Sequence, residues 1–90
     1  MKVYKYALNP AALIVINLPK GAKPLYASQQ HGKNIYLWAL VDPDAPLEKR
    51  YFRIIVTGYE IAEPPERLKF INTFFKNDGD YVFHLFEVIL

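Results

Sequence analysis

The sequence has 90 residues, of which 52% are hydrophobic, 16% aromatic and 22% charged, and its formal net charge is +2. A chain of this length forms one domain with a modest core, which excludes a two-domain enzyme, and its composition is too apolar for disorder. The absence of cysteine excludes disulfides and zinc sites that use thiolates. Eleven Lys and Arg against nine Asp and Glu do not predict a nucleic-acid binder, so we expect no sequence-specific nucleic-acid partner.

Turn-forming residues recur about every ten residues, a spacing typical of a small antiparallel β domain. The turns lie at 9–10, 19–21, 31–34, 42–46, 63–65 and 77–80. Seven runs of strand-forming residues lie between them, at 3–8, 13–18, 24–29, 35–41, 51–57, 68–75 and 81–88. Only 62–68 suits a helical turn, because Pro64 and Pro65 are tolerated where a helix begins. The sequence therefore predicts a single all-β domain, 1–90, folded as a small antiparallel β-sandwich or partly open barrel of about seven strands with one short helical turn.

The stretch YLWALVDPDAPLEKRYFRI, residues 36–54, joins two apolar runs through a loop that contains two prolines. Pro43 and Pro46 cannot donate a backbone hydrogen bond to a sheet, so the loop 42–46 must lie outside the strand pairing. We expect the first run to be a central strand and the second run to return beside it. In the second run, Phe52 faces the core and Arg53 projects from the opposite face, because side chains alternate along a strand.

The segment 77–80 carries an Asp-Gly step, which favours a tight hairpin because glycine adopts a positive φ without steric cost. We therefore expect 69–76 and 81–88 to pair as antiparallel strands. A positive φ at Gly79 is the specific expectation.

No arrangement of catalytic or metal-binding residues stands out. Asp42 and Asp44 are interpreted as turn residues that bind backbone N–H groups, rather than as a pair of catalytic carboxylates. Ser28 has no neighbouring base, and the scattered glycines form no phosphate loop. His84 is expected to be hydrogen-bonded and partly buried rather than a metal ligand. We therefore expect a protein that is not an enzyme and uses neither a metal nor a cofactor.

Cations, amides and aromatic rings are the remaining functional candidates, and they suit binding rather than catalysis. Guanidinium groups hold phosphates, amides pair with the edges of bases, and an aromatic plane stacks on a base. The candidate ligand-binding residues are Lys49, Arg50, Tyr51, Arg53, Gln30, His31 and Trp38. The alternative is that the three cations form a solvated surface and that Trp38 belongs to the core; for Trp38 we favour the core.

A set of sequence blocks extends over nearly the whole chain. The blocks are LPKGA at 18–22, Gln30 and Gly32, LWALVDPDAP at 37–46 followed by Glu48, Thr57-Gly58, FINTF at 70–74 and VFHLFEV at 82–88. Together they resemble a family of small proteins encoded by bacteriophages and prophages. The sequence departs from the family pattern at Val56 and Asn72, where glycine is usual, which makes the chain stiffer there. The family has no assigned activity, so the resemblance implies a phage origin without indicating a chemistry.

Two functional hypotheses follow. The first is a non-catalytic phage protein that sequesters a small anionic ligand, such as a nucleotide immune signal, or blocks a host defence protein, in the host cytoplasm. The alternative is an accessory or assembly protein that acts through protein–protein contacts. Free sheet edges in a chain without disulfides also favour a homodimer or larger assembly, built partly from the first or last strand. The apolar run 11–18 is too short for a bilayer, so we expect no membrane association.

Overall fold

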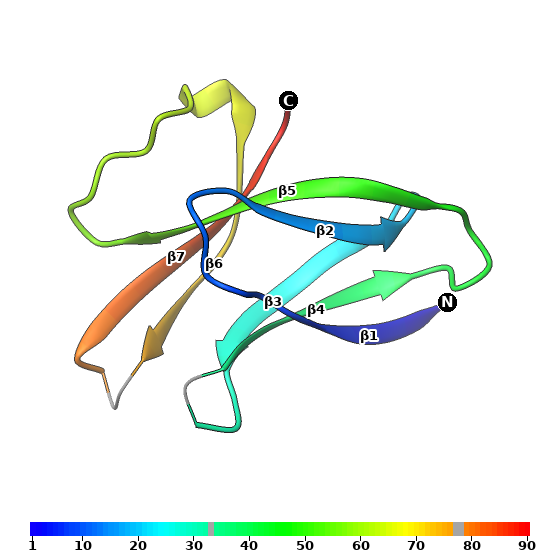
Figure 1. The fold of residues 1–90 in the computed structure, drawn as a ribbon, viewed down its shortest axis with the longest axis horizontal. Coiled ribbons are helices and arrows are strands. Elements are labelled where there is room, and N and C mark those ends of the chain that lie inside the picture. Colours follow the sequence, from blue (N-terminus) through cyan, green and yellow to red (C-terminus); the bar gives the residue numbers. More distant parts are fainter. Residues whose placement is uncertain (33, 77–78) are drawn as a thin grey trace.

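The structure is a computed structural model in which residues 1–32, 34–76 and 79–90 are described. These residues form seven strands and one 3₁₀ turn (Figure 1). The elements are β1 (Lys2–Ala7), β2 (Ile14–Pro19), β3 (Lys23–Gln29), β4 (Ile35–Val41), β5 (Leu47–Val56), η1 (Pro65–Arg67), β6 (Leu68–Lys76) and β7 (Tyr81–Val88). The predicted all-β sandwich with one short helical turn is therefore confirmed, and its described strands do not close into a barrel.

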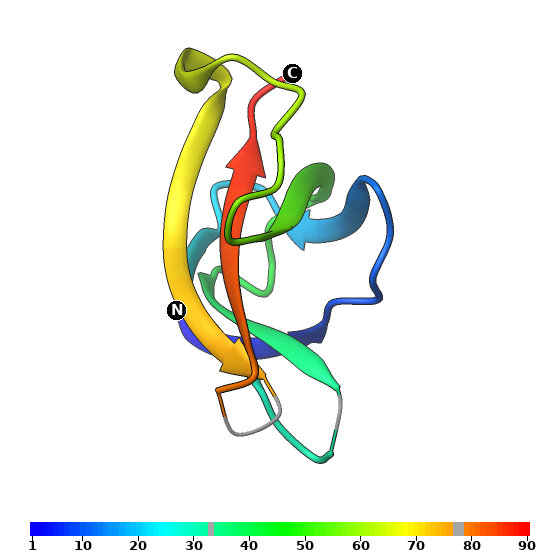
Figure 2. The ribbon, with the colours of Figure 1, turned by 90° about the vertical axis from the view of Figure 1, so that its left-hand side faces the viewer.

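The strands form two antiparallel sheets. Sheet A contains β1, β4 and β3 in that order, and sheet B contains β2, β5, β7 and β6. The end of β3 and the end of β6 lie toward the same end of the molecule, while η1 lies at the opposite end (Figures 1 and 2).

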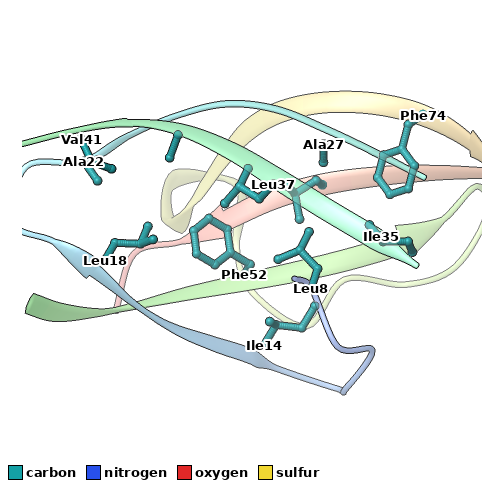
Figure 3. Close-up of a cluster of buried hydrophobic side chains, with 12 residues drawn as sticks. Leu8, Ile14, Leu18, Ala22, Ala27, Ile35, Leu37, Val41, Phe52 and Phe74 are labelled. Atoms are coloured by element: carbon teal, nitrogen blue, oxygen red, sulfur yellow. The ribbon is translucent and has the colours of Figure 1, made fainter. Parts of the chain in front are cut away.

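Side chains from both sheets fill the space between them, and β4 shows the clearest alternation. In β4, Ile35, Leu37, Ala39 and Val41 are buried, and the residues between them lie on the other face. Phe52 of β5 is fully buried, as predicted, and its ring lies in the middle of the cluster, close to Leu37 (Figure 3). The first apolar run of the stretch 36–54 is thus the central strand of sheet A.

The second apolar run does not return beside β4. β5 begins at Leu47, earlier than the predicted start, and pairs with β2 and β7 in sheet B. In the preceding loop, Asp42 Oδ1 accepts a hydrogen bond from the Asp44 N–H (3.1 Å), and the Asp42 backbone oxygen accepts one from the Ala45 N–H (3.1 Å). The prediction that the two runs are neighbouring strands is wrong, because the apolar inner face of β4 must be covered by an opposite sheet.

The two sheets meet at the edges of β3 and β6, where Asn72 joins them. The register of β6 shifts between Phe70 and Asn72, which is the mark of a β-bulge. The Asn72 amide donates a hydrogen bond to the Ala27 backbone oxygen (2.8 Å), and its Oδ1 accepts one from the Ala27 N–H (2.7 Å). The Asn72 side chain therefore takes the place of a backbone peptide group, and β1 and β2 remain as the outer edges.

The last two strands pair as predicted, and β7 lies inside sheet B between β5 and β6. Asn77 and Asp78 of the expected turn lie outside the described residues. Gly79 has a φ of +95°, which confirms the expectation for this position.

Candidate functional site

The outer face of sheet A points away from the core and gathers aromatic side chains. Strand register places alternate residues of its three strands on this face, because paired residues in an antiparallel ladder share a face. The members are Val3, Lys5 and Ala7 of β1, Lys23, Tyr26 and Ser28 of β3, and Tyr36, Trp38 and Leu40 of β4. Together with Gln30 and His31 in the turn after β3, we call this set the aromatic face.

Aromatic rings form a row on this face. Tyr36 and Trp38 are two residues apart in β4, and their ring centroids are 6.4 Å apart. His31 meets Tyr36 edge-on, with centroids 6.2 Å apart and an interplanar angle of 89°. Tyr26, the register partner of Trp38, is 51% exposed. Tyr36 and Trp38 are half-buried, so part of each side chain is exposed to solvent.

Two lysines and an amide flank the rings. Lys5 Nζ lies 4.6 Å from the centroid of the Tyr36 ring, a cation–π contact, and donates a hydrogen bond to Gln30 Oε1 (3.0 Å). These contacts hold the ammonium group over the Tyr36 ring, where it can meet a bound anion. Lys23 of β3 is exposed and lies on the other side of β4 from Lys5.

A pocket of about 260 Å³ adjoins the aromatic face at Tyr36, where β1 ends and β4 begins. It is lined by Ala7, Leu8, Asn9, Pro10, Asn34, Ile35 and Tyr36. The Asn34 amide donates a hydrogen bond to the His31 backbone oxygen (3.4 Å), which ties the pocket to the turn. Sites that enclose a small molecule usually measure about 300 to 1,000 Å³, so this pocket suits part of a ligand.

Arg50 is held by a buried carboxylate. Glu87, only 3% exposed, accepts two hydrogen bonds from the Arg50 guanidinium, one from Nε and one from Nη2 (2.8 Å). Arg50 Nη1 donates to the Ala22 backbone oxygen (2.9 Å). The hydrogen bonds to Glu87 raise the pKa of Arg50. Arg50 therefore joins three segments of the chain and has an internal partner for each of its nitrogens.

Arg53 is engaged in a similar way on the outer face of sheet B. Its Nη2 donates to Glu63 Oε2 (2.6 Å), its Nε donates to the other carboxylate oxygen, and its Nη1 donates to the Ala12 backbone oxygen. The hydrogen bond from Arg53 lowers the pKa of Glu63. The outward direction predicted for Arg53 is confirmed, since its register partner is Phe86 while the neighbouring Phe52 is buried.

The structure does not bring all the candidate residues together. It places Gln30, His31 and Trp38 on the aromatic face. Lys49, Arg50 and Tyr51 line a shallow pocket of about 250 Å³ beside Glu87. Arg53 lies on the outer face of sheet B. The prediction that Trp38 belongs to the core is wrong. An all-apolar run such as LWALV has no polar residue to mark its outer face, so alternation alone could not orient it.

Sequence reasoning also missed the segregation of charge along the chain. Residues 1–41 contain five lysines and no Asp or Glu, whereas residues 42–90 contain six Lys or Arg and all nine Asp and Glu. Their formal charges are therefore +5 and −3, which give the overall +2. Because all the strands of sheet A come from the first of these segments, sheet A contains no carboxylate. A charge count over each half of the sequence would have found this signal.

His84 lies on the outer face of sheet B between two hydroxyl groups. Its Nε2 is 2.7 Å from Thr57 Oγ1 and its Nδ1 is 2.8 Å from Thr73 Oγ1. This confirms the expectation of a hydrogen-bonded, half-buried histidine. In the described part of the chain, no three His, Cys, Asp or Glu side chains lie close enough together to hold a metal ion. No helix there is both long and apolar enough to cross a bilayer.

Comparison with known proteins identifies the family. Residues 1–89 match the family described as Domain of unknown function (DUF7352). The chain belongs to the DUF7352 family. No curated protein and no solved structure matches it. For this DUF7352 chain, the aromatic face is therefore the candidate site on the strength of its own geometry.

Proposed function

We propose that the protein is a non-catalytic binding protein whose aromatic face holds a base-bearing anionic ligand of the nucleotide class. The observation that carries this proposal is the row of His31, Tyr36 and Trp38 with the Lys5 ammonium group 4.6 Å from the Tyr36 ring. The rings supply stacking planes for a base, and the ammonium group supplies a positive charge for a phosphate. Binding of this kind needs neither a nucleophile nor a general base.

In a phage-infected cell, such a protein would sequester a nucleotide immune signal in the host cytoplasm. The resemblance of the sequence to phage-encoded proteins and its small size support this role. Sequestration depends on affinity alone, which fits a site composed of stacking surfaces and a fixed cation.

Arg50 and Arg53 are not part of the proposed site. Glu87 and Glu63 occupy their guanidinium groups, and neither arginine lies on the aromatic face. A phosphate at either arginine would displace a carboxylate that accepts two hydrogen bonds, and would leave that carboxylate without its partner.

The proposal is tested by the fluorescence of Trp38, which is the single tryptophan of the chain. Cyclic dinucleotides and trinucleotides are titrated into the protein at low salt, and we expect saturable quenching. The Tyr36→Leu variant removes one ring of the row, and we expect its affinity to fall by about tenfold, as for the loss of one stacking contact.

The matched control is Phe75→Leu, which removes an exposed ring from sheet B and should bind as the wild type does. Circular dichroism establishes that both variants are folded. Absence of quenching by every nucleotide at millimolar concentration would overturn the proposal.

A second candidate function is that of an accessory protein, and the exposed aromatic side chains of β6 favour it. Phe70 and Phe75 are 56% and 63% exposed, and Phe70 meets Phe86 with ring centroids 5.5 Å apart. Exposed apolar side chains that gather on a strand suit contact with another protein. If this function holds, a Phe70→Ser, Phe75→Ser double variant loses copurification with a phage protein, and Tyr36→Leu retains it.

A further inference from the structure

We propose that the aromatic face also binds single-stranded nucleic acid, in an extended form and without sequence preference. This inference rests on the proposed function and deepens it, because it names a polymer where the proposed function requires only a base and a phosphate. Four features of the face support it: the spacing of its rings, its openness, the arrangement of its charges and the small number of amide side chains on it.

The spacing of the rings suits successive bases of one strand. The centroids of His31 and Tyr36 are 6.2 Å apart, and those of Tyr36 and Trp38 are 6.4 Å apart. Stacked bases in a duplex strand are about 3.4 Å apart, so bases seated on these rings would be separated from one another. Proteins that bind single strands use such platforms, in which each base stacks on a side chain instead of on its neighbour.

The surface is also open, as a polymer requires. Tyr26 and Val3, at opposite margins of the face, are 51% and 54% exposed. The adjoining pocket of about 260 Å³ lies beside Tyr36 and not beneath the row. An extended strand can enter and leave such an open face at both ends, and it can cover more of the face than a single nucleotide does.

The charges lie where the backbone of a strand would run. Lys5 is the register partner of Trp38 from β1, and Lys23 is the register partner of Leu40 from β3, so the two ammonium groups flank the rings of β4. No carboxylate lies within the strands of sheet A, and Asp42 and Asp44 follow β4 in the next loop. Lysine is a flexible point charge, which suits phosphates whose positions vary with sequence.

Few side chains on the face could read the edge of a base. Gln30 is the one amide side chain of the aromatic face, and its Oε1 already accepts a bond from Lys5. Recognition of a particular base uses paired donors and acceptors in fixed positions. Stacking and charge, which dominate here, tolerate any base, so we expect binding without sequence preference.

The test compares ligands by length and strandedness, with quenching of Trp38 as the signal. The probes are a thymidine dinucleotide, thymidine oligomers of four and twelve nucleotides, a mixed-sequence 12-mer, a 12-base-pair duplex and a cyclic dinucleotide. We expect affinity to rise with length and to be similar for the two 12-mers. With two phosphates neutralised, affinity for single strands should fall about sevenfold between 50 and 200 mM salt.

Charge variants give a second measurement, the anisotropy of a labelled 12-mer. Lys23→Gln removes one of the two proposed phosphate contacts, and we expect weaker binding and a salt slope that is smaller by about 0.7. The control Lys69→Gln removes an exposed lysine from β6 and should leave the slope as in the wild type. Circular dichroism shows whether each variant is folded.

The outcomes separate this inference from the proposed function. Binding of the cyclic dinucleotide with no gain for longer strands would overturn the inference and leave the proposed function standing. Equal affinity for the duplex and the single strand would also overturn it, because charge alone would then explain binding. Failure of every probe at millimolar concentration would overturn both.

Discussion

Arg50 and Glu87 show how burial gives a charged residue a structural role. The two are distant in sequence, yet both point into the interior, where Glu87 is 3% exposed. A buried charge is tolerated when it is paired and its hydrogen bonds are satisfied, and here the Ala22 backbone oxygen completes the set. Arg50 therefore stabilises the junction of β5 and β7.

Substitution of Glu87 by alanine should destabilise the protein strongly, because it removes the buried carboxylate that accepts two hydrogen bonds from the half-buried Arg50 guanidinium. We expect a loss of about 3 kcal/mol in the free energy of unfolding, measured by urea denaturation. Glu48→Ala is the matched control, since the Glu48 carboxylate lies 3.5 Å from Arg50 Nη1 but is 39% exposed. The control should cost less than about 1 kcal/mol. Equal losses for the two variants would contradict this assignment.

Asn72 is the second residue whose side chain determines the fold locally. Asn72→Ala leaves both the N–H and the carbonyl oxygen of the buried Ala27 without partners, and we expect a loss of about 2 kcal/mol. Asn72→Asp keeps the acceptor for the Ala27 N–H but places a carboxylate against the Ala27 oxygen, so it should also destabilise. Thermal or urea unfolding measures both changes. A neutral Asn72→Asp variant would show that the bond to the Ala27 oxygen contributes nothing.

At the scale of elements, Arg53 fastens two connecting segments to sheet B. It lies on β5, and it holds Ala12 from the β1–β2 connection and Glu63 from the segment before η1. These segments lack strand partners of their own. Arg53 therefore helps to hold both segments against sheet B.

Acid should weaken this connection in a defined direction. The pKa of Glu63 in the folded protein lies below its ordinary value of 4.5, because Arg53 donates hydrogen bonds to it. The stabilising effect is therefore fully present above about pH 4.5 and is lost as the pH falls through the lower, native pKa. Stability measured from about pH 6 to pH 3 should fall less steeply in Glu63→Gln than in the wild type. Identical profiles would contradict the prediction.

The β6–β7 hairpin depends on the backbone of Gly79. Gly79 has a φ of +95°, and in the described part of the chain no atom of a non-neighbouring residue lies within 4 Å of the position that a Cβ would take. A side chain there would therefore strain the backbone without clashing with a neighbour. We expect Gly79→Ala to cost about 1 kcal/mol, measured by urea unfolding. Gly79→Asn should cost less, because asparagine tolerates positive φ better than alanine does. A loss of only a few tenths for Gly79→Ala would show that the turn does not need glycine.

At the scale of the whole molecule, the order of the strands decides which edges can meet a partner. The last strand, β7, is enclosed by β5 and β6, so an assembly built on the last strand is not available in this fold. β3 and β6 are joined through Asn72. Of the two outer edges, β1 is exposed along nearly its whole length, whereas β2 has buried side chains at both ends.

We therefore expect a homodimer formed through β1. Sedimentation equilibrium should show a dimer at high micromolar concentration, and hydrogen exchange should show that β1 amides become protected as concentration rises. Because the aromatic face lies on the same sheet, pairing of β1 edges would place two such faces side by side. A monomer at high micromolar concentration would contradict the prediction.

Local sequence was sufficient to predict most strands, the η1 turn and the conformation of Gly79, because residue propensities and proline restrictions act within a few residues. It was also sufficient to select Gln30, His31 and Trp38 as candidates, and the pairing of β3 with β4 places all three on the aromatic face. The site residues on separate strands, Lys5 and Lys23, could not be found this way. Their position depends on which strands are neighbours in sheet A.

Only the tertiary structure decided the direction of Trp38, the sheet to which β5 belongs and the partners of Arg50 and Arg53. In the run LWALV both faces are apolar, so the outer face was determined by which side could be covered by sheet B. Glu87 reached Arg50 because β5 and β7 pair within that sheet. These outcomes depend on contacts between residues far apart in sequence, whose free energies appear only when the sheets pack. The sequence by itself determined the strands and the charge of each segment, and packing determined which of those charges remain free to bind a ligand.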